Sequence, residues 1–336
     1  MKTVKLGRTD LEINPLGFGG IPIQRIGVDE AVEVVEYCIE KGINFIDTAR
    51  LYGDSEDKIG KVLPKYRDKV IIATKAMSRD KEGMAKEIEE SLNNLNIDCI
   101  DLYQCHNVRS LEQLDTILSD DGAYQALKEA KSIGKIKHIG ITSHKTPVLL
   151  RALELDVFDT IQVPFNIIEN EPAEELLPLC KENNIGVIVM KPVAGGALKD
   201  HVPASLKFIL NHPVSVAIPG MESKEQIDEN LTAITNPELT DKELEELQAE
   251  ADSLGEEFCR KCDYCAPCPS GVDIPLMFIV DAYYSRYNMP EWATNRYRKM
   301  EINAGHCVEC GRCEEKCPYE LPIIDMLKEV HQHMGE

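Results

Sequence analysis

The feature that most constrains the fold is a repeated alternation of short apolar runs with amphipathic helical patterns, between about residues 16 and 235. The apolar runs have the length of buried parallel strands, and each is followed by a helical pattern. We expect eight strands, at residues 15–18, 44–47, 70–74, 100–104, 138–142, 160–163, 186–190 and 214–218. Eight such units over this length predict an α/β fold, a closed (β/α)8 TIM barrel rather than an open sheet.

Helical patterns lie at residues 29–41, 81–94, 111–133, 172–183 and 224–234. Ahead of the first strand, the stretch 3–13 contains a turn and predicts a hairpin over the bottom of the barrel. A capping box that begins at Thr240 starts a further helix, which Gly255 is expected to end. We therefore expect a barrel over residues 1–255 and a second domain over residues 256–336.

The second domain holds eight of the chain's 12 cysteines, in two tight runs. The runs are Cys259, Cys262, Cys265 and Cys268, and then Cys307, Cys310, Cys313 and Cys317. The second run is the C-x2-C-x2-C-x3-C-P pattern of bacterial ferredoxins, whereas the first has two residues instead of three before its last cysteine. Two residues between thiolates allow a turning backbone to direct several sulfurs at one metal cluster.

Eight cysteines match two [4Fe–4S] clusters with four ligands each. In ferredoxins with two clusters, the fourth cysteine of one run binds the other cluster. This rule predicts one cluster on Cys259, Cys262, Cys265 and Cys317, and a second on Cys307, Cys310, Cys313 and Cys268. Structural zinc and disulfides are the alternatives. Four cysteines in one run favour iron–sulfur over zinc, and disulfides require an oxidising compartment.

The net charge and the hydropathy of the chain limit the classes of partner and the cellular compartment that we expect. The net charge of −21 argues against nucleic acid, or an anionic membrane surface, as the main partner. No apolar run reaches the length of a membrane span, and the first residues carry no signal-peptide pattern. We therefore expect a cytoplasmic protein.

Four polar residues fall where predicted strands end. Asp47, Lys75 and His106 end the second, third and fourth strands, and Tyr52 lies in the loop after Asp47. In a (β/α)8 barrel, catalytic groups lie at the C-terminal ends of the strands. Taken singly, each residue has another explanation: Asp47 could cap a helix, Tyr52 could belong to a turn, Lys75 could be a solvated loop charge, and His106 could be a buried histidine. A lysine directly after an apolar strand is costly unless it is paired, so the four together predict an active site.

This combination suits the reduction of a carbonyl group. Hydride addition leaves alkoxide charge on the oxygen, which then needs a proton. Tyr52 can donate it, and the Lys75 ammonium is expected to lower the tyrosine pKa from its ordinary value of about 10. Asp47 would keep Lys75 charged and oriented, and His106 would hydrogen-bond the carbonyl oxygen.

The barrel portion, up to about residue 250, resembles the aldo-keto reductase family. The Asp-Thr-Ala-x-x-Tyr-Gly motif at 47–53, the Thr-Lys pair at 74–75 and the strand-terminal His106 look like that family's tetrad of Asp, Tyr, Lys and His. The resemblance implies a small-molecule carbonyl substrate. It also implies NADP(H) or NAD(H), bound across the barrel mouth without a Rossmann fold.

The same resemblance implies which residues contact the cofactor. Ser143 and Gln162 match the residues that hold the carboxamide, whereas His144 stands where asparagine is usual. Met190 replaces a tyrosine that commonly stacks on the nicotinamide, and Lys191 beside it is either a loop charge or a phosphate ligand. The remaining expected contacts are Gly19, Gly20, Pro192, Ser223, Lys224, Gln226, Glu229 and Asn230.

The family's cations for a 2′-phosphate are not present at the matching positions. Gly220 and Met221 replace a Lys-Ser pair, and Gln226 replaces an arginine. A strong preference for NADPH is therefore not expected, although Lys224 could supply part of the charge.

The cysteine-rich domain resembles the α-helical dicluster ferredoxin module appended to some aldo-keto reductases, and three functions follow. The barrel could be a carbonyl reductase whose clusters are structural or sense redox state. The clusters could instead relay electrons to an external carrier, with a flavin between nicotinamide and cluster, although no motif indicates a flavin site. The third possibility is a nucleotide-binding regulatory subunit. The complete tetrad favours an enzyme.

Overall fold

The computed structural model describes residues 3–254, 258–260, 264–285 and 290–335. The chain divides into two compact units, Met1–Ala251 and Asp252–Glu336. Each unit is described by itself. The boundary predicted between residues 255 and 256 lies outside the described residues.

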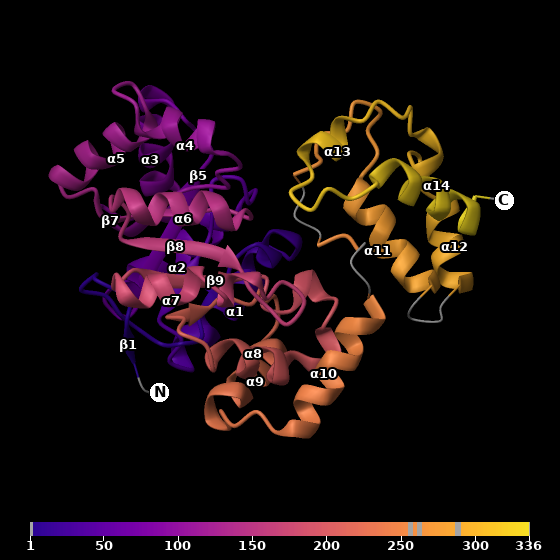
Figure 1. Ribbon diagram of the computed structural model, residues 1–336, viewed down its shortest axis with the longest axis horizontal. Helices are drawn as coiled ribbons and strands as arrows, with labels where there is room; N and C mark the ends of the chain where they lie inside the picture. The colour runs from indigo at the N-terminus through magenta and orange to yellow at the C-terminus, as the bar shows by residue number, and fades with distance from the viewer. Residues whose placement is uncertain (1–2, 255–257, 261–263, 286–289, 336) are drawn as a thin grey trace. The chain divides into compact units, whose positions relative to one another are not determined.

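The first unit is built on a sheet of eight parallel strands (Figure 1). They are β3 (Phe18–Gly19), β4 (Phe45–Asp47), β5 (Ile71–Ala76), β6 (Ile100–Cys105), β7 (Ile136–Thr142), β8 (Thr160–Pro164), β9 (Gly186–Met190) and β10 (Val216–Ala217). Each strand pairs with its neighbour in sequence. Parallel bridges from Leu16 to Ala217 and from Gly19 to Gly220 join the two outer strands and close the ring. The predicted (β/α)8 barrel is confirmed.

Helices lie on the outside of the sheet, most of them between successive strands and the last two after β10 (Figure 1). They are α1 (Val28–Glu40), α2 (Ser55–Tyr66), α3 (Lys81–Leu95), α4 (Leu111–Leu118), α5 (Ala123–Ser132), α6 (Thr146–Leu155), α7 (Leu176–Glu182), α8 (Val202–Leu210), α9 (Lys224–Thr235) and α10 (Asp241–Leu254). Apolar side chains of these helices and of the outward face of the strands form the largest core. The helical patterns at residues 29–41, 81–94 and 224–234 are confirmed as α1, α3 and α9, whereas α2, α6 and α8 lie outside the patterns named from the sequence.

One predicted helix is wrong: residues 111–133 form two helices, α4 and α5. The chain leaves the helical conformation at Ser119, which is extended. At Gly122 a side chain would not fit, because a Cβ there would lie 2.2 Å from the carbonyl oxygen of Ile117.

The capping box is confirmed at the start of α10, where the Thr240 N–H donates to Glu243 (2.9 Å) and the Glu243 N–H donates to the Thr240 hydroxyl (3.2 Å). The predicted end at Gly255 lies outside the described residues.

A hairpin fills one end of the barrel, as residues 3–13 predicted. Strands β1 (Val4–Lys5) and β2 (Glu12–Ile13) pair antiparallel. Leu6, Leu11 and Ile13 are buried together with inward-facing strand residues such as Phe45 and Leu102. This hairpin lies at the N-terminal ends of the strands, so the C-terminal ends remain for polar groups.

The second unit is helical. It contains α11 (Ile274–Ser285), α12 (Pro290–Arg298), α13 (Arg312–Lys316) and α14 (Ile323–Met334). Its core is a separate cluster that includes Met277, Val280, Tyr297 and Leu327. Most of the aromatic residues described between the cysteine runs pack against this core, whereas Trp292 is exposed.

Within the part of the chain that the structure describes, no helix is both long enough and apolar enough to cross a bilayer.

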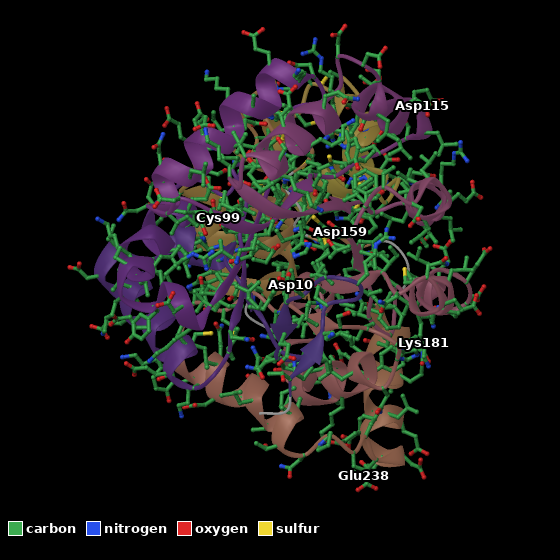
Figure 2. All side chains as sticks on the ribbon, turned by 90° about the vertical axis from the view of Figure 1, so that its left-hand side faces the viewer. Asp10, Cys99, Asp115, Asp159, Lys181 and Glu238 are labelled. Atoms are coloured by element: carbon green, nitrogen blue, oxygen red, sulfur yellow. The ribbon has the colours of Figure 1, made fainter. Side chains whose placement is uncertain are left out.

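A partly exposed group of ion pairs ties the hairpin to the barrel. His138 of β7 contacts Asp10 of the hairpin through Nε2 (2.7 Å) and Asp159 through Nδ1 (3.5 Å). Figure 2 labels Asp10 and Asp159, which lie near each other on this side of the molecule. Burial lowers the pKa of His138, but the hydrogen bonds to the two carboxylates outweigh it, and the pKa is raised above its ordinary value.

This geometry predicts that replacing His138 by Gln destabilises the barrel in a pH-dependent way. Because the folded-state pKa of His138 is raised, its contribution is complete below the unfolded value of about 6.5 and disappears as pH rises through the folded value. Urea unfolding of wild type and His138→Gln between pH 5 and 9 measures the difference (the range brackets about 6.5). We expect the difference in free energy of unfolding to be largest at the acidic end.

The matched control is Lys131→Gln, which removes another cation from Asp159 (3.1 Å). His138 stays in place in this variant, so its cost should not follow the pH dependence expected of His138→Gln. A cost of His138→Gln that is constant across the range would contradict the assignment.

Candidate active site and cluster-binding sites

The barrel brings the four predicted catalytic residues to neighbouring strand ends. Asp47 is the last residue of β4, and Lys75 lies near the end of β5. His106 follows β6 directly, and its N–H donates to the carbonyl of Ala76 on β5 (2.9 Å). Tyr52 lies in the loop between β4 and α2. Because the strands are parallel and adjacent, their C-terminal ends meet at one rim.

Lys75 and Asp47 form an ion pair inside the barrel. The Lys75 Nζ lies 2.5 Å from Asp47 Oδ1 and also donates to the carbonyl of Thr48 (2.8 Å). The two residues are 0% and 2% exposed. Burial lowers the pKa of Lys75, and the negative charge of Asp47 opposes this effect. Each charge is tolerated in this environment because the other is in contact with it.

Tyr52 lies beside this pair. The Lys75 ammonium is 5.1 Å from the centre of the Tyr52 ring, and the ring meets His106 edge-on at 6.0 Å between centroids. The expected lowering of the Tyr52 pKa is wrong for this arrangement. Burial, followed by the charge of Asp47, raises the pKa of Tyr52. The phenol is therefore protonated across the physiological pH range, which is the state a proton donor needs.

His106 is a buried, neutral imidazole. Burial and the positive charges of Lys75, Arg79 and Arg109 hold its pKa well below the usual range. The guanidinium of Arg79 donates to the carbonyls of His106 (2.7 Å) and Asn107 (2.9 Å), which holds the backbone at this strand end. A neutral imidazole can donate one N–H to a substrate oxygen.

Gln104 is a site residue that the sequence reading missed. It lies two positions before His106 on β6, so both side chains face the barrel interior. Its amide donates to Asp47 Oδ2 (3.3 Å) and to Gln162 Oε1 (3.0 Å). A glutamine two residues before His106 in a buried strand was the available signal, because a buried amide needs partners of its own.

The residues expected at the nicotinamide lie at the ends of β7, β8 and β9. Gln162 is buried inside the barrel next to Gln104. The Ser143 hydroxyl donates to the carbonyl of Val108 (2.6 Å), so its lone pairs rather than its proton remain for a ligand. His144 contacts Asn107 through Nδ1 (3.2 Å), and burial holds its pKa well below the usual range.

Met190 ends β9 and is half-buried. Lys191 follows with a left-handed backbone (φ 55°), a conformation that is uncommon outside glycine. Its carbonyl accepts from the Asn166 side chain (3.1 Å), which helps to hold the turn before Pro192. Strained backbone of this kind is concentrated at ligand sites, and it fits the expected position at the barrel mouth.

The segment expected to hold the adenosine phosphates forms the start of α9. Ser223 caps this helix by accepting from the Gln226 N–H (3.3 Å), and the Gln226 side chain accepts from the Glu222 N–H (2.7 Å). The partly exposed Lys224 side chain pairs with Glu33 (2.9 Å). Of the other two expected contacts, Glu229 is exposed and Asn230 is buried. A capped helix start is compatible with a nucleotide phosphate, and Glu33 already offsets the charge of Lys224.

Gly19 lies at the closure of the barrel, and Gly20 follows it. A Cβ on Gly19 would lie 2.8 Å from the carbonyl oxygens of Ile218 and Pro219. The Gly20 N–H donates to the carbonyl of Asp47 (2.8 Å), so this glycine also lies at the rim of the catalytic tetrad.

The cysteines of the second unit surround two hollows. The first is lined by Cys259, Cys265 and Cys317, with Arg260, Ile274, Pro275, Phe278, Tyr319, Leu321 and Ile323. The second is lined by Cys265, Cys268, Cys307, Cys310 and Cys313, with Pro269, Ser270, Ile274, Val308, Arg312, Ile324 and Leu327. Cys317 thus lines a hollow with Cys259, and Cys268 lines the other with Cys307, Cys310 and Cys313.

These donor sets fit iron–sulfur clusters. Among the described residues, no three His, Cys, Asp or Glu side chains are close enough to hold a single metal ion. A [4Fe–4S] cluster binds its four thiolates at the periphery of a cube, so its ligands surround a cavity rather than a point. Cys265 lines both hollows. Cys262, the remaining predicted ligand, lies outside the described residues.

Comparison with known proteins agrees with this architecture. Residues 15–204 match the aldo/keto reductase family, and residues 258–322 match a 4Fe-4S dicluster domain. The chain is 28% identical over 304 residues to the uncharacterized oxidoreductase YqkF of Bacillus subtilis (strain 168), covering 74% of this chain and 96% of that protein. It is 30% identical over 302 residues to L-galactose dehydrogenase of Arabidopsis thaliana, covering 75% and 91%.

Among solved structures, the aldo-keto reductase AKR11C1 from Bacillus halodurans (holo form) matches with a TM-score of 0.64 at 28% identity, covering 74% of this chain and 96% of that one. The barrel and its strand-end polar residues define an oxidoreductase. The chain belongs to the aldo/keto reductase family and carries a 4Fe-4S dicluster domain. Members of this family use NAD(P)H.

Proposed function

We propose that the barrel reduces an aldehyde or ketone to an alcohol, with Tyr52 as the proton donor. The observation that carries this proposal is the buried Lys75–Asp47 pair, which lies against the Tyr52 ring at the strand ends. A nucleotide-binding subunit without turnover does not need a buried cation beside a phenol. The bound nicotinamide cofactor would supply the hydride.

The residues of the tetrad have separate tasks in this proposal. The His106 N–H donates a hydrogen bond to the carbonyl oxygen and orients it. The Tyr52 hydroxyl gives its proton to that oxygen as alkoxide charge develops. The Lys75 ammonium, held by Asp47, stabilises the phenolate that remains. The Gln104 side chain on β6 donates a hydrogen bond to Asp47 and thereby fixes the Lys75–Asp47 pair relative to this strand.

Replacing Tyr52 by Phe should lower kcat for carbonyl reduction by roughly 10²–10⁴-fold, because the acid is lost. Binding of NADH and NADPH, followed by fluorescence, should be unchanged. Tyr66→Phe is the matched control, since it removes a hydroxyl that contacts Glu40 (2.9 Å) on the outside of the barrel. Undiminished turnover in Tyr52→Phe would remove Tyr52 as the donor.

We further propose two [4Fe–4S] clusters with crossed ligands: Cys259, Cys262, Cys265 and Cys317 hold one, and Cys268, Cys307, Cys310 and Cys313 hold the other. The grouping of cysteines around the two hollows supports this assignment. Anaerobically purified protein should contain about eight iron atoms per chain.

Paired alanine variants separate crossed from uncrossed ligation. If Cys259 and Cys317 share a cluster, the double variant Cys259→Ala/Cys317→Ala should lose about four iron atoms, and Cys307→Ala/Cys317→Ala about eight. Uncrossed ligation reverses these two results. Iron analysis and Mössbauer spectroscopy measure them, and zinc in place of iron would contradict both.

A second function, electron relay to an external carrier, is favoured by one observation: Cys310, a proposed ligand of the second cluster, is exposed. An exposed ligand brings a cluster within reach of a partner. Nicotinamide transfers two electrons as hydride and a cluster accepts one, so we expect a flavin to be needed between them.

If the clusters relay electrons, anaerobic NADH or NADPH should bleach their visible absorbance. The experiment has two arms, one without and one with added FMN. Bleaching in either arm would support the relay, and the FMN arm alone would place a flavin in the path. Full retention of absorbance in both arms would leave the clusters a structural or sensing role.

A further inference from the structure

Glu56 is a buried carboxylate next to the catalytic tetrad but not part of it. It lies in the first turn of α2 and is 1% exposed. Its Oε1 accepts from the Thr74 hydroxyl (2.8 Å), and its Oε2 accepts from the Arg50 guanidinium (2.5 Å). A carboxylate is removed from water at high cost unless its oxygens are satisfied, and these contacts satisfy them.

Both partners of Glu56 are directly connected to Lys75. Thr74 precedes Lys75 on β5, and the Arg50 N–H donates to the Lys75 carbonyl (3.0 Å). Because side chains alternate along a strand, Thr74 faces the helices while Lys75 faces the barrel interior. From the helix side of the sheet, Glu56 therefore fixes the backbone of Lys75 through two residues, Thr74 and Arg50.

Glu56 also acts on Lys75 through its charge. The titratable groups beside Lys75 inside the barrel are Asp47 from β4, Tyr52 from the following loop and His106 after β6. The charge of Glu56 acts on Lys75 from α2, on the other side of the sheet. Burial lowers the pKa of Lys75, whereas Asp47 and then Glu56 raise it. Arg50 shares its own charge between Glu56 and the exposed Glu90 (2.9 Å).

We propose that Glu56 is a positioning residue for the reaction, which keeps Lys75 cationic and fixed beside Tyr52 through Thr74 and Arg50. This inference rests on the proposed carbonyl reduction. Glu56 touches neither substrate nor cofactor in this role, and it acts only through Lys75. Without its charge, Lys75 loses its proton at a lower pH, and the phenolate left on Tyr52 loses its stabilising cation.

The test is the pH profile of kcat in Glu56→Gln, which keeps the shape and the acceptor for Thr74 but removes the charge. The two proteins should differ least in kcat at pH 6, where Lys75 keeps its proton most readily. At pH 9 the variant should lose roughly tenfold more turnover than wild type, which is less than the full effect of general acid–base catalysis. Glu90→Gln, which removes the exposed partner of Arg50, should follow the wild-type profile.

A structural role alone would lower kcat by the same factor at every pH, and that result would overturn the proposal. If Glu56→Gln does not fold, Arg50→Gln/Glu56→Gln replaces the ion pair by two amides that can hydrogen-bond to each other. The double variant should show the same loss at pH 9, and a wild-type profile there would also overturn the proposal.

A measurement without turnover separates this inference from the proposed function. The Lys75 side-chain carbon resonance in ¹³C-lysine protein, assigned with Lys75→Met, should titrate at lower pH in Glu56→Gln. An unchanged titration overturns the inference, whatever the activity. An altered titration with an unaltered kcat profile overturns the positioning role. Wild-type turnover in Tyr52→Phe would instead reject the proposed function.

Discussion

Closure of the parallel sheet is the constraint on which the rest of the barrel depends. The last strand must meet the first, and it does so through close backbone contacts at Gly19, where a Cβ would lie 2.8 Å from two carbonyl oxygens. Closure gives every strand two neighbours and brings all C-terminal ends to one rim. The hairpin fills the opposite end with apolar side chains. The polar side chains of the strand ends are therefore concentrated at a single site.

That site holds charges that are costly to bury. Asp47, Lys75 and Glu56 are almost inaccessible to water, and each is stable because an opposite charge or hydrogen-bond donor contacts it. The same low-polarity environment raises the pKa of Tyr52 and keeps His106 neutral. The resting site is then a protonated phenol and a neutral imidazole beside one ammonium. Such a set can donate to a carbonyl oxygen without first losing a proton.

The second unit meets a different demand. A cubane cluster binds four thiolates around a cavity. This unit carries a 4Fe-4S dicluster domain, and its cysteines line two hollows: Cys317 lies with Cys259 in one, and Cys268 lies with Cys307 in the other. The hollows thereby join the two cysteine runs within the small core of this unit.

The sequence by itself determined the barrel, the four strand-end residues and the grouping of cysteines, because each depends on a local period or spacing. It did not determine the break at Ser119 within residues 111–133, since the two helices share one apolar period and only the contact at Gly122 separates them. It also gave the wrong direction for the Tyr52 pKa, because burial is a property of the folded chain. Gln104 and Glu56 acquire their roles only through partners on other strands and helices, and these partners are brought together by tertiary structure alone.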